Sequence, residues 1–63
     1  MKDYQKRVVA EREELNDRLD RLIVFLGGDV FPELSVAEQE RLKKQAMLMQ
    51  DYLEILDERI ENF

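Results

Sequence analysis

Polar and aromatic side chains that could bind a small ligand recur along one edge of the second half of the chain. Gln45, Tyr52 and Arg59 are spaced by seven residues, and Met49 lies beside them. Seven residues are close to two turns of a helix, so a helix would place these side chains in one line. The line combines hydrogen-bond donors, an aromatic face and a positive charge, which suits a small polar ligand.

A second group of such residues lies near the start of the chain, at Tyr4, Gln5, Arg7 and Glu11. If the two halves pack antiparallel, Gln5 and Arg7 lie towards Arg59. The two arginines would then hold phosphate by bidentate contacts, with Tyr52 or Tyr4 free to stack on a base. The alternative is ordinary packing, because Glu, Gln, Arg and Lys commonly flank the seam of a coiled coil.

The sequence offers little for catalysis or metal binding. It has no cysteine and no histidine, so the usual nucleophile pairs, zinc sites and the Glu-x-x-His motif of helical bundles are missing. The single serine is expected to cap a helix, and neither a Walker lysine loop nor G-x-G-x-x-G occurs. We therefore expect a protein that is not an enzyme and that uses no cofactor or metal.

The elements that must position these residues are two helices separated by one break. Helical spacing of apolar residues predicts a first helix over residues 3–26, with Asp3 as its N-cap. Its apolar stripe consists of Val8, Leu15, Leu19, Leu22 and Leu26. Gly27 and Gly28 are expected to end this helix in a positive-φ conformation. Residues 27–34 contain both glycines and the only proline, which predicts an ordered loop whose apolar side chains fold back as a plug.

The second helix is predicted over residues 35–62. It opens with Ser35 and Glu38 in the spacing of a capping box, in which each side chain accepts a hydrogen bond from the other residue's backbone N–H. Alternating steps of four and three residues then predict a coiled-coil seam. The seam consists of Leu42, Ala46, Met49, Leu53, Leu56, Ile60 and Phe63.

The length of 63 residues allows one domain, residues 1–63, with a small core. A domain of this size buries only about 60% of the surface of its unfolded chain. Several apolar residues lie outside the two stripes, namely Val9, Ile23, Val24, Leu48 and Ile55. We therefore predict an all-α antiparallel two-helix hairpin that assembles into a homo-oligomeric helical bundle, with a dimer and a larger ring both left open.

The charge and hydropathy exclude several other partners. The net charge is −5, which disfavours binding to a nucleic acid polymer. No apolar run approaches the roughly 20 residues that span a membrane, and no signal-peptide pattern is visible. We expect a soluble protein of the cytoplasm, with which the absence of cysteine agrees.

Two parts of the sequence form a more specific pattern. The first is Tyr-Gln-x-Arg-Val-Val-x-Glu at residues 4–11, and the second is the series Glu38, Gln39, Leu42, Gln45, Met49, Tyr52, Leu56 and Arg59. The pattern covers nearly the whole chain and resembles small phage and prophage helical-hairpin proteins related to a crAss-like phage product. That family is more distantly similar to the anti-CBASS and anti-Thoeris hairpins of phages, which sequester cyclic nucleotide signals without cleaving them.

The resemblance implies a non-enzymatic sponge in the bacterial host cytoplasm, with an inter-chain pocket for a cyclic nucleotide of the cyclic ADP-ribose type made by TIR-domain defence proteins. Arg7 and Arg59 would clamp phosphates and Tyr52 would stack on adenine, while ribose or base edges would be read by Gln5, Glu11 and Gln45. The acidic excess then requires that positive charge be concentrated locally. The alternative is a helical interaction module that binds or inhibits a host protein without a small ligand.

Overall fold

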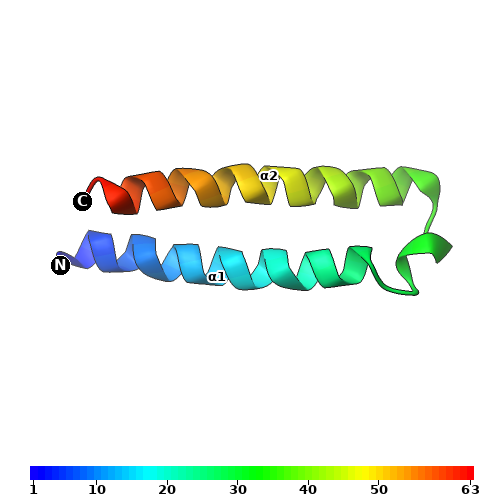
Figure 1. Cartoon of the computed structure of the whole chain (residues 1–63), viewed down its shortest axis with the longest axis horizontal. Helices are drawn as coiled ribbons and strands as arrows, with labels where there is room; N and C mark the ends of the chain where they lie inside the picture. Colours follow the sequence, from blue (N-terminus) through cyan, green and yellow to red (C-terminus); the bar gives the residue numbers. More distant parts are fainter.

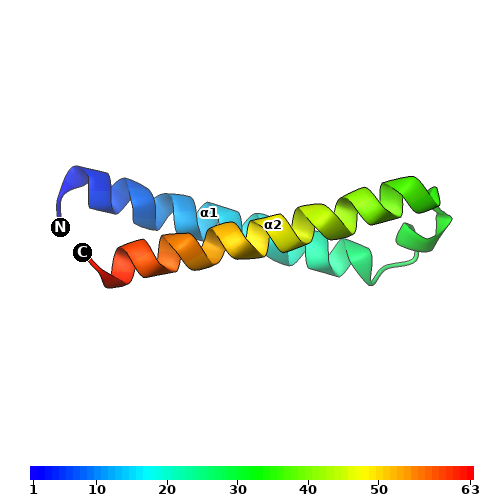
Figure 2. The ribbon, with the colours of Figure 1, turned by 90° about the horizontal axis from the view of Figure 1, so that it is seen from above.

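A computed structural model describes residues 1–63 as two helices packed side by side. Helix α1 spans Asp3–Leu26 and helix α2 spans Val36–Glu61, with the short 3₁₀ helix η1 at Phe31–Glu33 between them. The connection lies at one end of the rod and both termini lie at the other (Figure 1). Seen from above, the two helices cross at a shallow angle (Figure 2). The predicted all-helical hairpin is thus confirmed.

The core of the hairpin is small. Leu56 is the one side chain with no exposed surface, and only five side chains are buried, namely Val8, Leu15, Leu19, Leu53 and Leu56. Ala46, Met49 and Ile60 pack against them from α2. All eight residues belong to the predicted stripes, because helical periodicity places apolar residues at these spacings on one face. Neither helix is long and apolar enough to cross a membrane.

The ends of α1 differ from the sequence-based expectations. Lys2, not Asp3, is the N-cap residue, and its backbone N–H donates to Gln5 Oε1 at 2.9 Å. Asp3 lies in the first turn, where its carboxylate interacts favourably with the positive end of the helix dipole and stabilises the helix. The prediction of a positive-φ glycine was wrong: no glycine has positive φ, and the Gly27 N–H instead bonds to Ile23 O and Val24 O in a tightened last turn.

The loop is held against the start of α2 by side-chain hydrogen bonds. Ser35 is the N-cap of α2, as predicted, and its Oγ accepts a bond from the Glu38 N–H at 3.2 Å. The reciprocal bond of a capping box is missing, because the Glu38 carboxylate accepts from Arg41 Nε at 2.9 Å. Gln39 Nε2 donates to Leu34 O at 2.9 Å and to Pro32 O at 3.3 Å, which fixes the loop. Phe31 and Leu34 are half-buried as expected of the plug, whereas Val30 is exposed.

Replacing the capping hydroxyl should therefore destabilise the hairpin. We expect Ser35→Ala to lower the free energy of unfolding by about 1 kcal/mol, the usual effect of removing a serine N-cap. Urea denaturation followed by circular dichroism measures this change. The control is Ser35→Asp, which retains an acceptor and should keep most of the stability. Equal losses in both variants would show that Ser35 Oγ does not cap α2.

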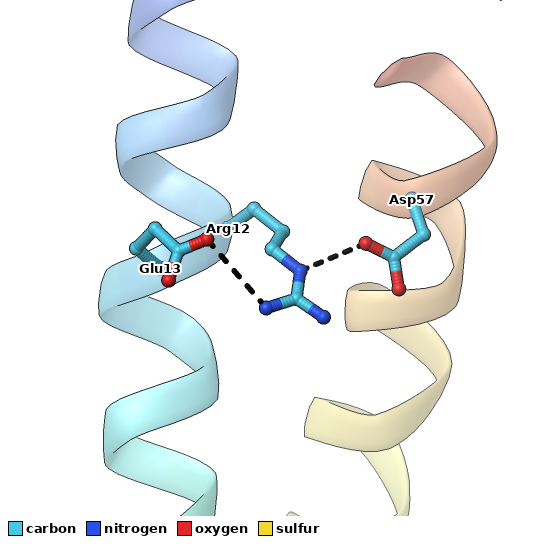
Figure 3. Close-up of polar contacts among 3 residues, drawn as sticks. All are labelled: Arg12, Glu13 and Asp57. Atoms are coloured by element: carbon cyan, nitrogen blue, oxygen red, sulfur yellow. Dashed lines mark hydrogen bonds and ion pairs between the residues drawn. The ribbon is translucent and has the colours of Figure 1, made fainter. Parts of the chain in front are cut away.

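Two side-chain contacts join α1 to α2 and mark which levels of the two helices lie side by side. In the first, Arg12 Nε of α1 donates to Asp57 Oδ1 of α2 at 2.8 Å (Figure 3). Within α1, Arg12 Nη1 also lies 3.7 Å from Glu13 Oε1. The hydrogen bond to Asp57, more than any other contact, raises the pKa of Arg12 above its ordinary value. Nearer the termini, the rings of Tyr4 and Phe63 meet edge to face with centroids 6.0 Å apart.

These two contacts lie on opposite sides of the hairpin. Tyr4 and Arg12 lie four residues before and after the buried Val8, so they flank the buried stripe of α1 on either side. We call the side that carries Tyr4 and Phe63 the open side. By helical periodicity it also carries two lines of residues spaced by seven, which are Tyr4, Glu11, Arg18 and Phe25 on α1 and Gln45, Tyr52 and Arg59 on α2.

Candidate ligand-binding site

A concavity of about 340 Å³ lies on the open side of α2. Its lining residues recur at spacings of three and four and are Arg41, Lys44, Gln45, Leu48, Met49 and Tyr52. One helix supplies all of them, so the concavity has a floor and a rim but no opposite wall. Its volume is at the lower end of the ~300 to 1,000 Å³ typical of small-molecule sites.

The rim of the concavity is positively charged although the chain is acidic. Arg41 and Lys44 line it, and no carboxylate does. Lys44 forms no ion pair, whereas Arg41 is bonded to Glu38 at 2.9 Å. The side chains of both Arg41 and Glu38 are exposed to solvent. Exposed ion pairs contribute at most about 1 kcal/mol to stability, so an anionic ligand could replace the Glu38 carboxylate. Two cations thus border the concavity, although the chain as a whole is acidic.

The remaining lining residues supply an apolar floor and an aromatic ring. Leu48 is 60% exposed and Tyr52 is 43% exposed, so both present apolar surface to the concavity. Gln45 Nε2 donates a weak hydrogen bond to Met49 Sδ at 3.9 Å, which leaves its amide oxygen free. The concavity thus offers a stacking surface, an amide and two cations within about three turns of one helix.

The structure separates the predicted site residues into two groups. Gln45, Met49 and Tyr52 share the concavity. The others lie towards the termini: Tyr4 packs on Phe63, and Gln5 Oε1 accepts from the Lys2 N–H. Arg7, Glu11 and Arg59 form no ion pair, and Arg7 and Arg59 are exposed.

The predicted pairing of Arg7 and Arg59 around a ligand is therefore not assembled at the concavity of a single chain. Arg59 lies two helical turns, roughly 10 Å, beyond Tyr52 on the same edge of α2. A second chain would be needed to bring either arginine to the concavity.

Sequence reasoning missed three lining residues, Arg41, Lys44 and Leu48. Arg41 lies four residues before Gln45 and Leu48 lies four residues before Tyr52, so adding the residue one helical turn before each of these two would have found them. The seven-residue spacing used for the prediction skipped them, because it samples every second turn.

Comparison with known proteins places the chain in a family. The sequence model of the family described as Sequestin matches residues 2–62. The chain is also 38% identical over 60 residues to a protein of Enterobacteria phage T4 described as an uncharacterized 7.5 kDa protein in the denB-rIIB intergenic region, and the match covers 95% of this chain and 94% of the phage protein. No solved structure matches. The narrower resemblance to a crAss-like phage product stays a prediction.

The match to the family spans both helices and the loop, so it includes the whole concavity on α2. The family name implies that its members sequester a ligand, and the phage T4 relative indicates a viral source. The chain belongs to the Sequestin family and is a small phage protein of that type.

Proposed function

We propose that this protein sequesters a cyclic nucleotide immune signal of its bacterial host without cleaving it. The signal would be of the cyclic ADP-ribose type, made by TIR-domain defence proteins, and it would be captured in the host cytoplasm. The observation that carries the proposal is the concavity on α2, in which an apolar floor and a tyrosine ring adjoin two cations. A nucleotide with two phosphates and an adenine has the complementary chemistry.

Each lining residue has a role in this proposal. Lys44 and Arg41 bind the phosphate oxygens, because both are cations on the rim and Lys44 has no competing carboxylate. Tyr52 stacks on the adenine ring, and Gln45 hydrogen-bonds to a ribose or base edge. Leu48 and Met49 contact the apolar faces of the ligand.

The wall that one chain lacks would come from a second chain. The candidate residues that lie outside the concavity, Tyr4, Gln5, Arg7, Glu11 and Arg59, are the ones available for that wall. In this arrangement Arg7 and Arg59 of one chain contact the phosphates that Lys44 of the other chain binds. A non-enzymatic role agrees with the side chains present, because the chain has no histidine or cysteine and its single serine caps α2.

Native mass spectrometry with a panel of cyclic dinucleotides and cyclic ADP-ribose isomers tests the proposal. We expect one class of ligand to remain bound in a fixed ratio to the protein, with a dissociation constant that isothermal titration calorimetry confirms. After heat denaturation the ligand should be released with its mass and chromatographic retention unchanged. Retention of no member of the panel, or release of a cleaved product, would contradict sequestration of this class of signal.

A second candidate function is an interaction with a host protein, and the loop end of the hairpin favours it. Exposed apolar side chains gather there, namely Ile23, Val24, Phe25, Val30 and Val36. The segment 22–40 that contains them has acidic residues but no lysine or arginine. An apolar surface with an acidic border suits a polypeptide partner with basic residues. Binding of a host protein by a chain that retains no nucleotide would support this function.

A further inference from the structure

We propose that the loop end of the hairpin is a docking surface for an amphipathic helix of another protein that carries lysine or arginine. The surface consists of the last turn of α1 and the acidic side chains of the loop beside it. None of these residues lines the concavity on α2. The proposal names the partner of the second candidate function and therefore rests on that function, but it does not depend on a bound nucleotide.

The last turn of α1 is apolar around its whole circumference. Its five consecutive apolar residues, which we call the apolar collar, are Leu22, Ile23, Val24, Phe25 and Leu26. Five successive residues of a helix point in all directions around its axis. Leu22 and Leu26 are half-buried, whereas Ile23 is 52% and Val24 is 74% exposed. A helix that is apolar on all sides is normally buried, so the collar lacks a partner within the chain.

The path of the loop explains why the collar is uncovered. Because Arg12 contacts Asp57, counting equal numbers of residues along both helices places the end of α1 near the level of Lys43. Helix α2 therefore extends about two turns beyond the end of α1 (Figure 1). Gln39 Nε2 donates to the carbonyl oxygens of Pro32 and Leu34, which holds the loop against these two turns. The loop thus covers the start of α2 and leaves the collar exposed.

The negative charge of the chain is concentrated around the collar. Segment 22–40 contains four acidic residues and no basic residue, whereas the rest of the chain contains 11 acidic and 10 basic residues. Two of the four carboxylates are paired with cations of the following turn of α2. The two that are exposed and form no ion pair are Asp29 and Glu33. Unpaired carboxylates beside an apolar surface favour a partner with positive charge.

The helix dipole of α1 adds to this charge. The C-terminal end of a helix carries partial negative charge, which a basic residue in the last turn commonly balances. Helix α2 has Arg59 in its last turn, whereas α1 has no basic residue there. A lysine or arginine of the partner would therefore be attracted both by the end of α1 and by the loop carboxylates. Both contributions have the same sign and lie at the same end of the hairpin.

A helix is the form of polypeptide that fits this surface. The chain has no strand, so a partner segment cannot extend a sheet edge. The apolar stripe of an amphipathic helix would pack on the collar, and basic residues that flank the stripe would contact Asp29 and Glu33. The same negative charge disfavours nucleic acids and anionic lipid surfaces as occupants.

Nuclear magnetic resonance of the ¹⁵N-labelled full chain tests the proposal with a synthetic probe. The probe is a peptide of about 18 residues with leucine and lysine at helical spacing, long enough for about five turns. We expect saturable chemical-shift changes confined to residues 22–36. A peptide with glutamate in place of every lysine should bind at least about tenfold more weakly, because its charge repels the loop carboxylates.

Two pairs of variants separate the apolar contact from the charge contact. Val24→Gln should raise the dissociation constant of the leucine–lysine peptide about tenfold, since it removes a buried valine from the complex. Its control, Met47→Gln, changes a side chain that is 67% exposed elsewhere on α2 and should have little effect. Glu33→Gln should weaken binding and its dependence on salt, whereas Glu54→Gln, an exposed residue far from the loop, should change neither.

Chemical-shift changes spread along the acidic residues of α1, or equal losses in a variant and its control, would overturn the proposal. Native mass spectrometry of the free protein checks for another occupant. If Val24→Gln changed the oligomeric state, a second copy of the chain would cover the collar, and the proposed partner would be wrong. Neither Val24 nor Glu33 lines the concavity, so nucleotide retention by these variants should be unchanged. Failure of peptide binding is therefore distinguishable from failure of nucleotide sequestration.

Discussion

The Lys44→Ala variant should bind the cyclic nucleotide about tenfold to a hundredfold more weakly than the wild type, since a hydrogen bond to a charged group contributes roughly 1.5 to 3 kcal/mol. Lys44 lines the concavity and has no carboxylate partner, so its ammonium group is available to a phosphate. Isothermal titration calorimetry with the ligand retained in native mass spectrometry measures the loss. The salt dependence of binding should also become weaker in the variant, because one charge contact is removed.

The neighbouring lysine provides a matched control. Lys43 lies on another face of α2, where its Nζ is 3.6 Å from Glu40 Oε1, and it does not line the concavity. Lys43→Ala therefore changes the net charge by the same amount and should leave the affinity within about twofold, as expected of an exposed ion pair. Equal losses in the two variants would indicate a general effect of net charge and would contradict a phosphate contact at Lys44.

The Leu56→Ala variant should be largely unfolded or should melt far below the wild type. Leu56 has no exposed surface and lies at the centre of a core of only five side chains. Truncation of a buried leucine to alanine typically costs about 2 to 5 kcal/mol, through lost burial and the cavity that remains. A hairpin of this size has little stability to lose. Thermal denaturation followed by circular dichroism measures the change.

A large apolar residue on the outside of the same helix is the control for Leu56. Met47 is 67% exposed and lies away from the open side, so Met47→Ala should change the melting temperature only slightly. Both variants should be compared at several protein concentrations, because association raises the apparent stability of a small chain. A Leu56→Ala protein as stable as Met47→Ala would contradict the position of the core.

These two predictions separate the binding surface from the core. The concavity lies on the open side of α2, whereas Leu56 faces α1. Lys44→Ala should thus retain the helical content and melting temperature of the wild type while losing affinity. Leu56→Ala should lose both folding and affinity. A variant that lost affinity through unfolding would be recognised by its circular dichroism spectrum.

The helices and the face that each one buries could be predicted from the sequence alone. Val8, Leu15 and Leu19 recur at helical spacing, as do Leu53 and Leu56, and all five are buried. Periodicity is a local property: whichever partner a helix packs against, residues three and four positions apart share one face. The role of Ser35 as a cap was predictable for the same reason, because its hydrogen bond joins residues three positions apart.

The register between the helices and the composition of the concavity depended on tertiary structure. The sequence alone did not pair Arg12 with Asp57, because the path of the loop through η1 sets which levels of the two helices meet. It also did not show that Arg7 and Arg59 lie apart from Tyr52 while Arg41 and Lys44 lie beside it. Spacing along one helix determines which of its side chains share an edge. Which of these side chains enclose a site depends on how the two helices pack against each other.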